Sequence, residues 1–190
     1  MNKLLAIAAA ALAVAGTAHA STPVVVDALA DAYGTSGATA VTLHAGEAFT
    51  VTVDPTDLWS AGALPRWSNA DGLTHDLYAT GSDESGQPAG TLIGQNWGTY
   101  STADGTFAYG ELVGRIGTGP YFAVGTSFSG VASSAGTLTL YYWDSYTLDN
   151  AGAVTAEVSA VPEPGSAALM LAGLAAVGGL ARRRAAKKSA

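Results

Sequence analysis

The sequence predicts an all-β domain, an antiparallel β-sandwich or jelly roll, flanked by an N-terminal signal helix and a C-terminal transmembrane helix. Three observations predict the sandwich. Short segments in which apolar and polar residues alternate recur along the middle of the chain, Gly, Asn, Asp and Ser mark the gaps between them, and no window keeps a helical period. Many short strands with this spacing are typical of two packed antiparallel sheets.

The strands are expected at 24–29, 47–53, 73–80, 106–116, 120–125, 137–143 and 154–158. The clearest is 137–143, where Leu138, Leu140 and Tyr142 share one face and the intervening residues share the other. Segment 69–104 is rich in Gly, Ser, Thr and Asp and predicts a hairpin with long loops. Such loops either carry a binding function or form a solvated insertion, and the sequence leaves both open.

The first twenty residues predict a secretory signal peptide. Lys3 supplies a positive start, an apolar run follows, and small residues at Ala18 and Ala20 predict cleavage before Ser21. The protein is therefore expected to be exported. The domains follow as 1–20 (signal peptide), 21–160 (β-sandwich domain) and 161–190 (C-terminal segment).

The C-terminal segment has three parts. Val161, Pro162, Glu163 and Pro164 form a stiff start that cannot be helical, because each proline fixes φ and removes a backbone donor. Residues 165–181 carry no charge, and basic residues follow at Arg182, Arg183, Arg184, Lys187 and Lys188. A charge-free run followed by basic residues predicts a membrane segment with a cytoplasmic C-terminus. As a helix the run would be about 25 Å long, marginal against a hydrocarbon core of about 30 Å.

These parts together resemble a PEP-CTERM sorting signal, with Val161–Pro164 as the motif and Arg182, Arg183 and Arg184 as the basic end. The resemblance implies recognition by an exosortase, a membrane enzyme that acts near Pro-Glu-Pro, after passage through the secretion machinery. It implies a precursor anchored in the inner membrane, and a final location at the cell surface or in the extracellular matrix. A plain membrane anchor is the alternative.

Composition limits the functions of the middle domain. It carries two basic residues, Arg66 and Arg115, against fourteen of the chain's 15 acidic residues, for a formal charge of about −12. Nucleic acids and anionic surfaces require a basic footprint, so a nucleic acid partner is excluded. With no cysteine in the chain, the domain must depend on its core or on a bound ion.

Catalytic motifs are absent from the sequence: it has no His-Glu-x-x-His, no Gly-x-Ser-x-Gly and no phosphate-binding loop. His44 and His75 are expected on surface loops, and Gly117-x-Gly119 is expected to form a hairpin turn. The sequence thus predicts a protein that is not an enzyme. An exported hydrolase stays an alternative that single acid substitutions would reveal.

One polar segment stands out between two predicted strands. Residues 143–152 read Trp-Asp-Ser-Tyr-Thr-Leu-Asp-Asn-Ala-Gly, and Asp144, Thr147, Asp149 and Asn150 offer side-chain oxygens within seven positions. Calcium takes several oxygens from carboxylates, amides, hydroxyls and carbonyls. The same residues also suit an ordinary polar turn.

Residues 110–117, 136–142 and 144–152, together with 56–67, resemble the calcium-dependent, galactose-binding PA-IL type lectin domain of bacteria. The resemblance implies a small jelly roll with one calcium held by the late loop and by an early backbone carbonyl. Carried over, the ligands would be Asp144, Asp149, Asn150, the carbonyl of Ala61 and, in a loop about two residues shorter than the family's, Thr147. No histidine stands where the family has one that contacts the sugar.

Trp143 and Tyr146 flank the polar segment and are the candidates for exposed rings that contact sugar. The sequence thus leads to an exported, sorted protein that binds carbohydrate or exopolysaccharide with calcium. The alternative is a structural matrix protein without a ligand site.

Overall fold

The structure, a computed structural model, describes residues 21–161, 171–175 and 178. Within them the chain forms strands β1 (Thr22–Asp27), β2 (Ala38–Leu43), β3 (Ala48–Val53), β4 (Trp59–Ser60), β5 (Trp67–Ser68), β6 (Leu77–Tyr78), β7 (Leu92–Gly94), β8 (Thr99–Thr102), β9 (Gly105–Ala108), β10 (Glu111–Ile116), β11 (Tyr121–Ala123), β12 (Ser127–Val131), β13 (Gly136–Trp143) and β14 (Ala151–Val161). None of the helical segments it describes has the length and apolar character needed to cross a membrane. The expected signal peptide and most of the sorting segment lie outside the described residues.

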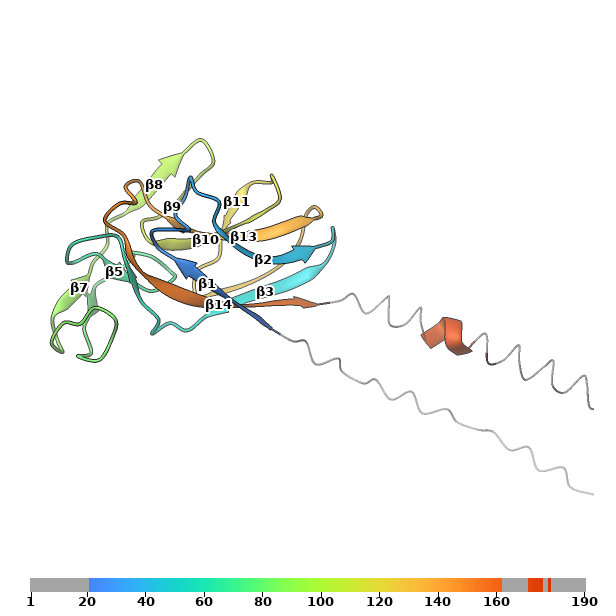
Figure 1. The fold of residues 1–190 in the computed structure, drawn as a ribbon, viewed down its shortest axis with the longest axis horizontal. Coiled ribbons are helices and arrows are strands. Elements are labelled where there is room, and N and C mark those ends of the chain that lie inside the picture. The colour runs from blue at the N-terminus through green and yellow to red at the C-terminus, as the bar shows by residue number, and fades with distance from the viewer. Residues whose placement is uncertain (1–20, 162–170, 176–177, 179–190) are drawn as a thin grey trace, which may run out of the picture.

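Two antiparallel sheets face each other, as predicted (Figure 1). One sheet has the order β12-β3-β14-β4-β5, and β1 pairs with β14 as well. The other has the order β11-β10-β13-β2. Strand β14 holds the first sheet together, because it pairs with β1, β3 and β4 along its length.

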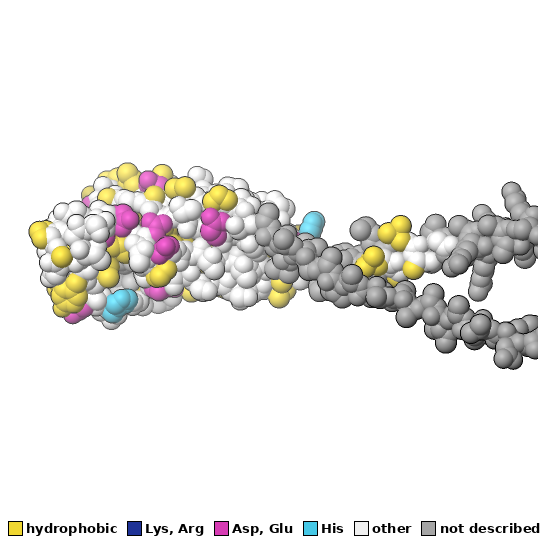
Figure 2. Space-filling model, turned by 90° about the horizontal axis from the view of Figure 1, so that it is seen from below, with side chains coloured by type: hydrophobic (Ala, Val, Ile, Leu, Met, Phe, Trp, Pro, Cys, Tyr) yellow, Lys and Arg dark blue, Asp and Glu magenta, His cyan; other side chains and the backbone are white. Residues whose placement is uncertain are grey.

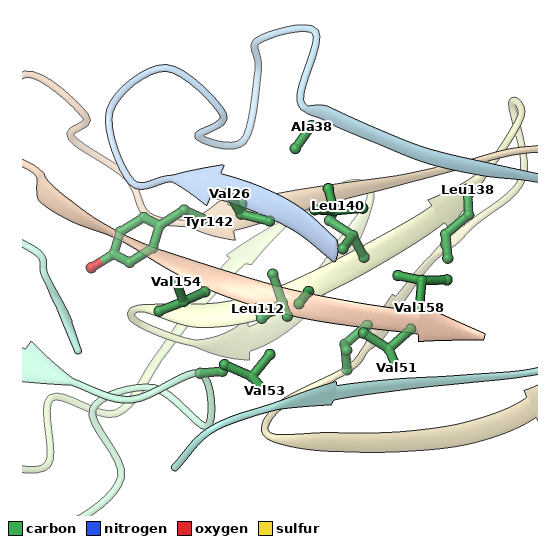
Figure 3. Close-up of a cluster of buried hydrophobic side chains, with 14 of the residues drawn as sticks. Val26, Ala38, Val51, Val53, Leu112, Leu138, Leu140, Tyr142, Val154 and Val158 are labelled. Carbon is green, nitrogen blue, oxygen red and sulfur yellow. The ribbon is translucent and has the colours of Figure 1, made fainter. Parts of the chain in front are cut away.

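The main core lies between the sheets (Figure 3). Leu138, Leu140 and Tyr142 of β13 point into it and are fully buried, which confirms the predicted face of this strand. Val51 and Val158 meet them from the opposite sheet. All the buried residues of this core lie between positions 24 and 158, so residues 21–161 contain what is needed to bury it.

A smaller aromatic cluster covers the outer face of the second sheet. Trp143, Tyr141 and Val113 are buried there under Tyr33 and the β8–β9 hairpin. The predicted hairpin within 69–104 is present as β6 paired with β7, whereas the β8–β9 hairpin begins in that segment and ends beyond it at Ala108.

Two of the longer strands, β2 and β12, were not anticipated, and the two-residue strands β4 and β5 were missed as well. Strand β2 consists mostly of small residues, Ala-Thr-Ala-Val-Thr-Leu, and β12 carries a glycine in its interior. Neither offers a strong alternating pattern, and both acquire their place by pairing with β13 and β3. The expected strand at 73–80 reduces to the two residues of β6.

The sandwich has two ends. We call them the tail end, where β14 ends before the C-terminal segment, and the loop end, where residues 144–150 lie. At the tail end, Val161 closes β14 opposite Ala48, which also faces Val131 of β12. At the loop end, residues 144–150 connect β13 to β14.

Gly117 lies at the tail end in the β10–β11 turn, as predicted, with a φ of 56° that suits glycine. His44 and His75 are exposed in loops, also as predicted.

Candidate functional site

Strand pairing brings the two predicted loops together at the loop end. Ser60 of β4 pairs with Ala151 of β14, and Trp59 pairs with Gly152. The next positions in this register are Ala61 and Asn150. Residues 61–66 therefore lie against residues 144–150, although more than seventy positions separate the two segments in the chain.

The late loop turns two of its polar side chains inward. Asp144 and Asn150 are only 5% and 6% exposed. The amide nitrogen of Asn150 donates to the carbonyl of Ala28 at 2.9 Å, which leaves its Oδ1 facing the loop. One carboxylate oxygen of Asp144 accepts the backbone N–H of Ser145 at 2.6 Å.

Asp149 reaches back toward the early loop. Its Oδ2 lies 3.3 Å from a guanidinium nitrogen of Arg66. The loop approaches so closely that a Cβ on Gly62 would collide with this carboxylate, and Gly62 has a φ of 112°. Arg66 itself is held by a hydrogen bond from Nε to the carbonyl of Ala63 and lies over the ring of Trp97.

Buried oxygens without hydrogen-bond partners gather around this loop. Among the described residues they are Asp149 Oδ1, Asn150 Oδ1, Tyr142 Oη and Ser68 Oγ. The hydroxyl of Tyr142 points away from the aliphatic side chains of the core (Figure 3). A Cβ on Gly110 would lie 2.8 Å from the Ser68 oxygen and 3.2 Å from the Tyr142 oxygen, so those two atoms flank one position. Buried polar atoms are normally paired, so we expect water or a bound ion to complete the hydrogen bonding or coordination of these oxygens.

Burial in this site disfavours the ionised form of Asp144. Burial raises the pKa of Asp144, and the neighbouring charge of Asp149 adds to the rise, while Arg66 and the backbone N–H groups of residues 145 and 146 oppose it. Burial also raises the pKa of Tyr142 well above its usual value, with a contribution from both carboxylates. The raised pKa of Tyr142 means that its hydroxyl stays neutral, whereas the ionised carboxylate of Asp144 carries a cost that a nearby cation would offset.

The residues present fit a hard cation bound by oxygen. Asp144, Asp149 and Asn150 offer carboxylate and amide oxygens, and Ala61 is buried beside them. The carbonyl of Thr147 accepts the N–H of Asn150 at 3.3 Å, and its side chain is partly exposed. In the part of the chain that the structure describes, no three His, Cys, Asp or Glu side chains cluster as a metal site. Calcium sites that use amide and carbonyl oxygens do not need three such groups.

The expectation of an exposed ring at Trp143 is wrong. This side chain is fully buried. Its indole N–H donates to the carbonyl of Tyr100 at 2.9 Å, and its ring lies 4.2 Å from that of Tyr33. The β8–β9 hairpin covers this outer face of β13, which the alternating sequence of 137–143 had suggested would be exposed to solvent. Trp143 therefore cannot contact a sugar, whereas Tyr146 is 60% exposed.

Sequence reasoning missed three residues of the site. Arg66 was noted only as one of the two basic residues and within the early segment 56–67, Tyr142 only as a core residue, and Ser68 not at all. The two basic residues of the domain are so few that a structural role for Arg66 could have been suspected. The unpaired hydroxyls of Tyr142 and Ser68 give no sequence signal, because only tertiary packing determines whether a hydroxyl finds a partner.

Comparison with known proteins gives two findings. Residues 160–185 match the model of the PEP-CTERM protein-sorting motif. Among solved structures, the N-terminal domain of EclA, a PllA-like lectin, is similar at 23% identity and a TM-score of 0.45, over 73% of this chain and 95% of that one. This likeness is too distant to say what the chain binds. No curated protein matches the sequence. The chain thus carries a β-sandwich followed by a PEP-CTERM motif, which marks it for export and exosortase-dependent sorting.

Proposed function

We propose that this protein is an exported, non-enzymatic carbohydrate-binding protein whose loop 144–150 holds a calcium ion. The observation that carries the proposal is the set of buried oxygens without partners at Asp149, Asn150 and Tyr142, beside the buried carboxylate of Asp144. Calcium would be held by Asp144, Asp149, Asn150 and the carbonyl of Ala61, with Thr147 as a further candidate. When bound, the calcium ion would accept hydroxyl oxygens of a sugar as further ligands.

Exposed aromatic rings near the loop support a sugar as the ligand. Tyr146 lies within the loop and is 60% exposed, and Trp97, 45% exposed, lies against the guanidinium of Arg66. Rings that are half open to solvent stack on sugar faces through their apolar surface. For an exported protein, exopolysaccharide at the cell surface or in the matrix is the accessible carbohydrate. Before processing, we propose that the C-terminal segment anchors the precursor in the inner membrane.

A structural matrix protein without a ligand site is the second candidate, and one contact favours it. The ion pair between Arg66 and Asp149 partly neutralises the loop without any cation. If this pair is sufficient, the loop is a closed polar turn and the sandwich is a scaffold. The two candidates differ in whether the domain responds to calcium.

The calcium test is a thermal melt of residues 21–161, which contain the whole core, with calcium and with a chelator. A ligand at about 100 times its dissociation constant stabilises by about 2.7 kcal/mol. At about 2–4 °C per kcal/mol, the midpoint should rise by roughly 5–10 °C. Asp144→Asn keeps the side-chain volume and should abolish the rise.

Asp76→Asn is the matched control, because Asp76 is exposed in the loop before β6 and is not among the residues proposed to hold the ion. It should keep the full calcium response. An equal midpoint with calcium and chelator in the unaltered domain would reject the calcium site and leave the scaffold as the better account.

The carbohydrate test measures retention of the same domain on immobilised agarose, dextran and the producing cell's own exopolysaccharide. Retention that requires calcium is expected on at least one of them. Tyr146→Ala should weaken it by about tenfold, the loss expected for one ring worth about 1.4 kcal/mol. Tyr78→Ala removes a ring of similar exposure elsewhere and should leave retention unchanged. Absence of calcium-dependent retention on all three would contradict sugar binding.

A further inference from the structure

The sorting motif begins without a spacer at the tail end of the sandwich. Val161, the first residue of Val-Pro-Glu-Pro, is still a strand residue and pairs with Ala48. The match to the PEP-CTERM motif begins one residue earlier, at position 160, which is inside β14. Three residues, Pro162, Glu163 and Pro164, separate the strand from the charge-free run that starts at Gly165.

This short connection limits how far the sandwich can lie from a membrane. Three residues span at most about 10 Å when fully extended. The headgroup layer on each side of a bilayer is roughly 5–8 Å thick, from a hydrocarbon core of about 30 Å within a total of 40–45 Å. If the charge-free run enters the hydrocarbon, the tail end of the sandwich must lie at the headgroups.

The tail end is suited to that position because it is nearly neutral in an acidic domain. Glu47 is the one acid in its turns, and Arg115 is the basic residue there, bonded through Nε to the carbonyl of Gly119. One further acid, Glu163, follows the end of β14 by two residues in the sequence. The nearest acid along β14 is Glu157, four residues from the strand end, or about 13 Å away. That exceeds a Debye length of about 8 Å, so anionic lipids at the tail end would be screened from it.

The acids gather elsewhere on the domain. Figure 2 shows one face, on which the Asp and Glu side chains lie over the left and middle of the sandwich and none over its right-hand end. The candidate site, with Asp144 and Asp149, lies at the opposite end of the strands from Val161. The charge distribution therefore gives the sandwich one end that repels an anionic surface less strongly than the other.

The tail end also presents apolar surface. A hollow of about 260 Å³ opens there between the sheets, lined by Phe49, Phe122 and Phe128 and by Pro120. Val131, at its rim, is 64% exposed and pairs with Ala48 of β3, the strand that lies between β12 and the tail-bearing β14. Exposed apolar side chains around an apolar hollow are typical of a contact surface.

We propose that the tail end of the sandwich is a lipid-facing surface that rests on the bilayer in the tail-bearing precursor, so that the candidate site points away from the membrane. The inference rests on the membrane-anchored precursor of the proposed function. The occupant is the bilayer surface, because the charge-free run that anchors the proposed precursor begins three residues beyond this end in the sequence. Cleavage before Ser21, if it occurs as expected, would also leave a positive amino terminus here, since Thr22 pairs with Val158.

The test uses residues 21–190 in vesicles of phosphatidylethanolamine and phosphatidylglycerol that carry a headgroup quencher. The chain has no cysteine, so Ser134→Cys and Ser145→Cys each give a single labelling position, at the tail end and at the loop end. Both side chains are exposed. After flotation with the vesicles, a fluorophore at position 134 should be quenched several-fold more strongly than one at position 145.

Val131→Asp should reduce the quenching at position 134, because it places a charge on the lipid-facing rim. Val25→Asp is its matched control, since Val25 is 63% exposed on β1, another edge strand, and should leave the quenching unchanged. Equal quenching at the two labels in floated protein would overturn the lipid-facing surface. Failure to float would overturn the anchored precursor and this surface with it. The calcium and carbohydrate tests use a domain without the tail, so they succeed or fail independently.

Discussion

Single acidic residues carry electrostatic costs in this domain, and Glu111 is a case outside the candidate site. Burial raises the pKa of this carboxyl above its ordinary value of 4.5, and the charge of Asp71 adds to the rise. The N–H of Ala108, which donates to Glu111 Oε2 at 2.8 Å, opposes it. The surroundings of Glu111 therefore favour its protonated form over its ionised form.

Glu111→Gln should raise the stability of residues 21–161 at neutral pH. A folded pKa above the unfolded one means that the cost is present in full above the folded pKa and is relieved as the pH falls through it toward 4.5. The advantage of the Gln variant should thus shrink over that window. Urea unfolding of both proteins across the window is the measurement, and an advantage independent of pH would contradict the assignment.

At the scale of elements, the candidate site depends on how closely the early loop approaches the late one. Gly62 is the contact point, because its missing side chain makes room for the carboxylate of Asp149 and the guanidinium of Arg66. The β4–β14 pairing fixes this approach. A side chain at Gly62 should therefore displace Asp149 and Arg66, in addition to straining the backbone of residue 62 itself.

Gly62→Ala should destabilise the domain by about 3 kcal/mol, from strain at a positive φ and from the collision with Asp149. Gly86→Ala tests strain alone, because Gly86 also has a positive φ but nothing within 4 Å, and should cost about 1 kcal/mol. Chemical denaturation gives both values. Only the Gly62 variant should also lose the calcium response, and equal costs for the two would show that the loops are not in contact.

At the scale of the whole molecule, the acidic excess destabilises the compact state. The domain has a formal charge of about −12, and like charges repel over a Debye length that falls from about 30 Å at 0.01 M salt to about 8 Å at 0.15 M. In the described residues, Arg66–Asp149 is the ion pair that salt would weaken, and an exposed pair contributes only about 0–1 kcal/mol. Screening of the repulsion should dominate.

The midpoint of thermal unfolding in chelator should therefore rise by a few degrees as sodium chloride increases over that range. Potassium chloride should give the same curve, which separates general screening from specific binding of sodium. A midpoint that is constant or falls with salt would mean that the acids are spaced too widely to repel.

The sequence by itself determined much of this protein. Alternation at 47–53 and 137–143 predicted which faces enter the core, because a strand repeats every two residues whatever its neighbours are. The polar loop at 144–150 and the sorting motif were also legible, since each is a contiguous run whose chemistry is local. The motif that begins at Val161 needed no structure to be identified.

Only the tertiary structure decided which side chains are buried at the site. Trp143 is covered by a hairpin more than thirty residues earlier in the chain, Arg66 meets Asp149 across paired strands, and Tyr142 loses its hydrogen-bond partners by burial. Strands β2 and β12 likewise exist through their pairing with β13 and β3. These outcomes depend on contacts between distant segments, and local periodicity carries no information about which segment will cover a given face.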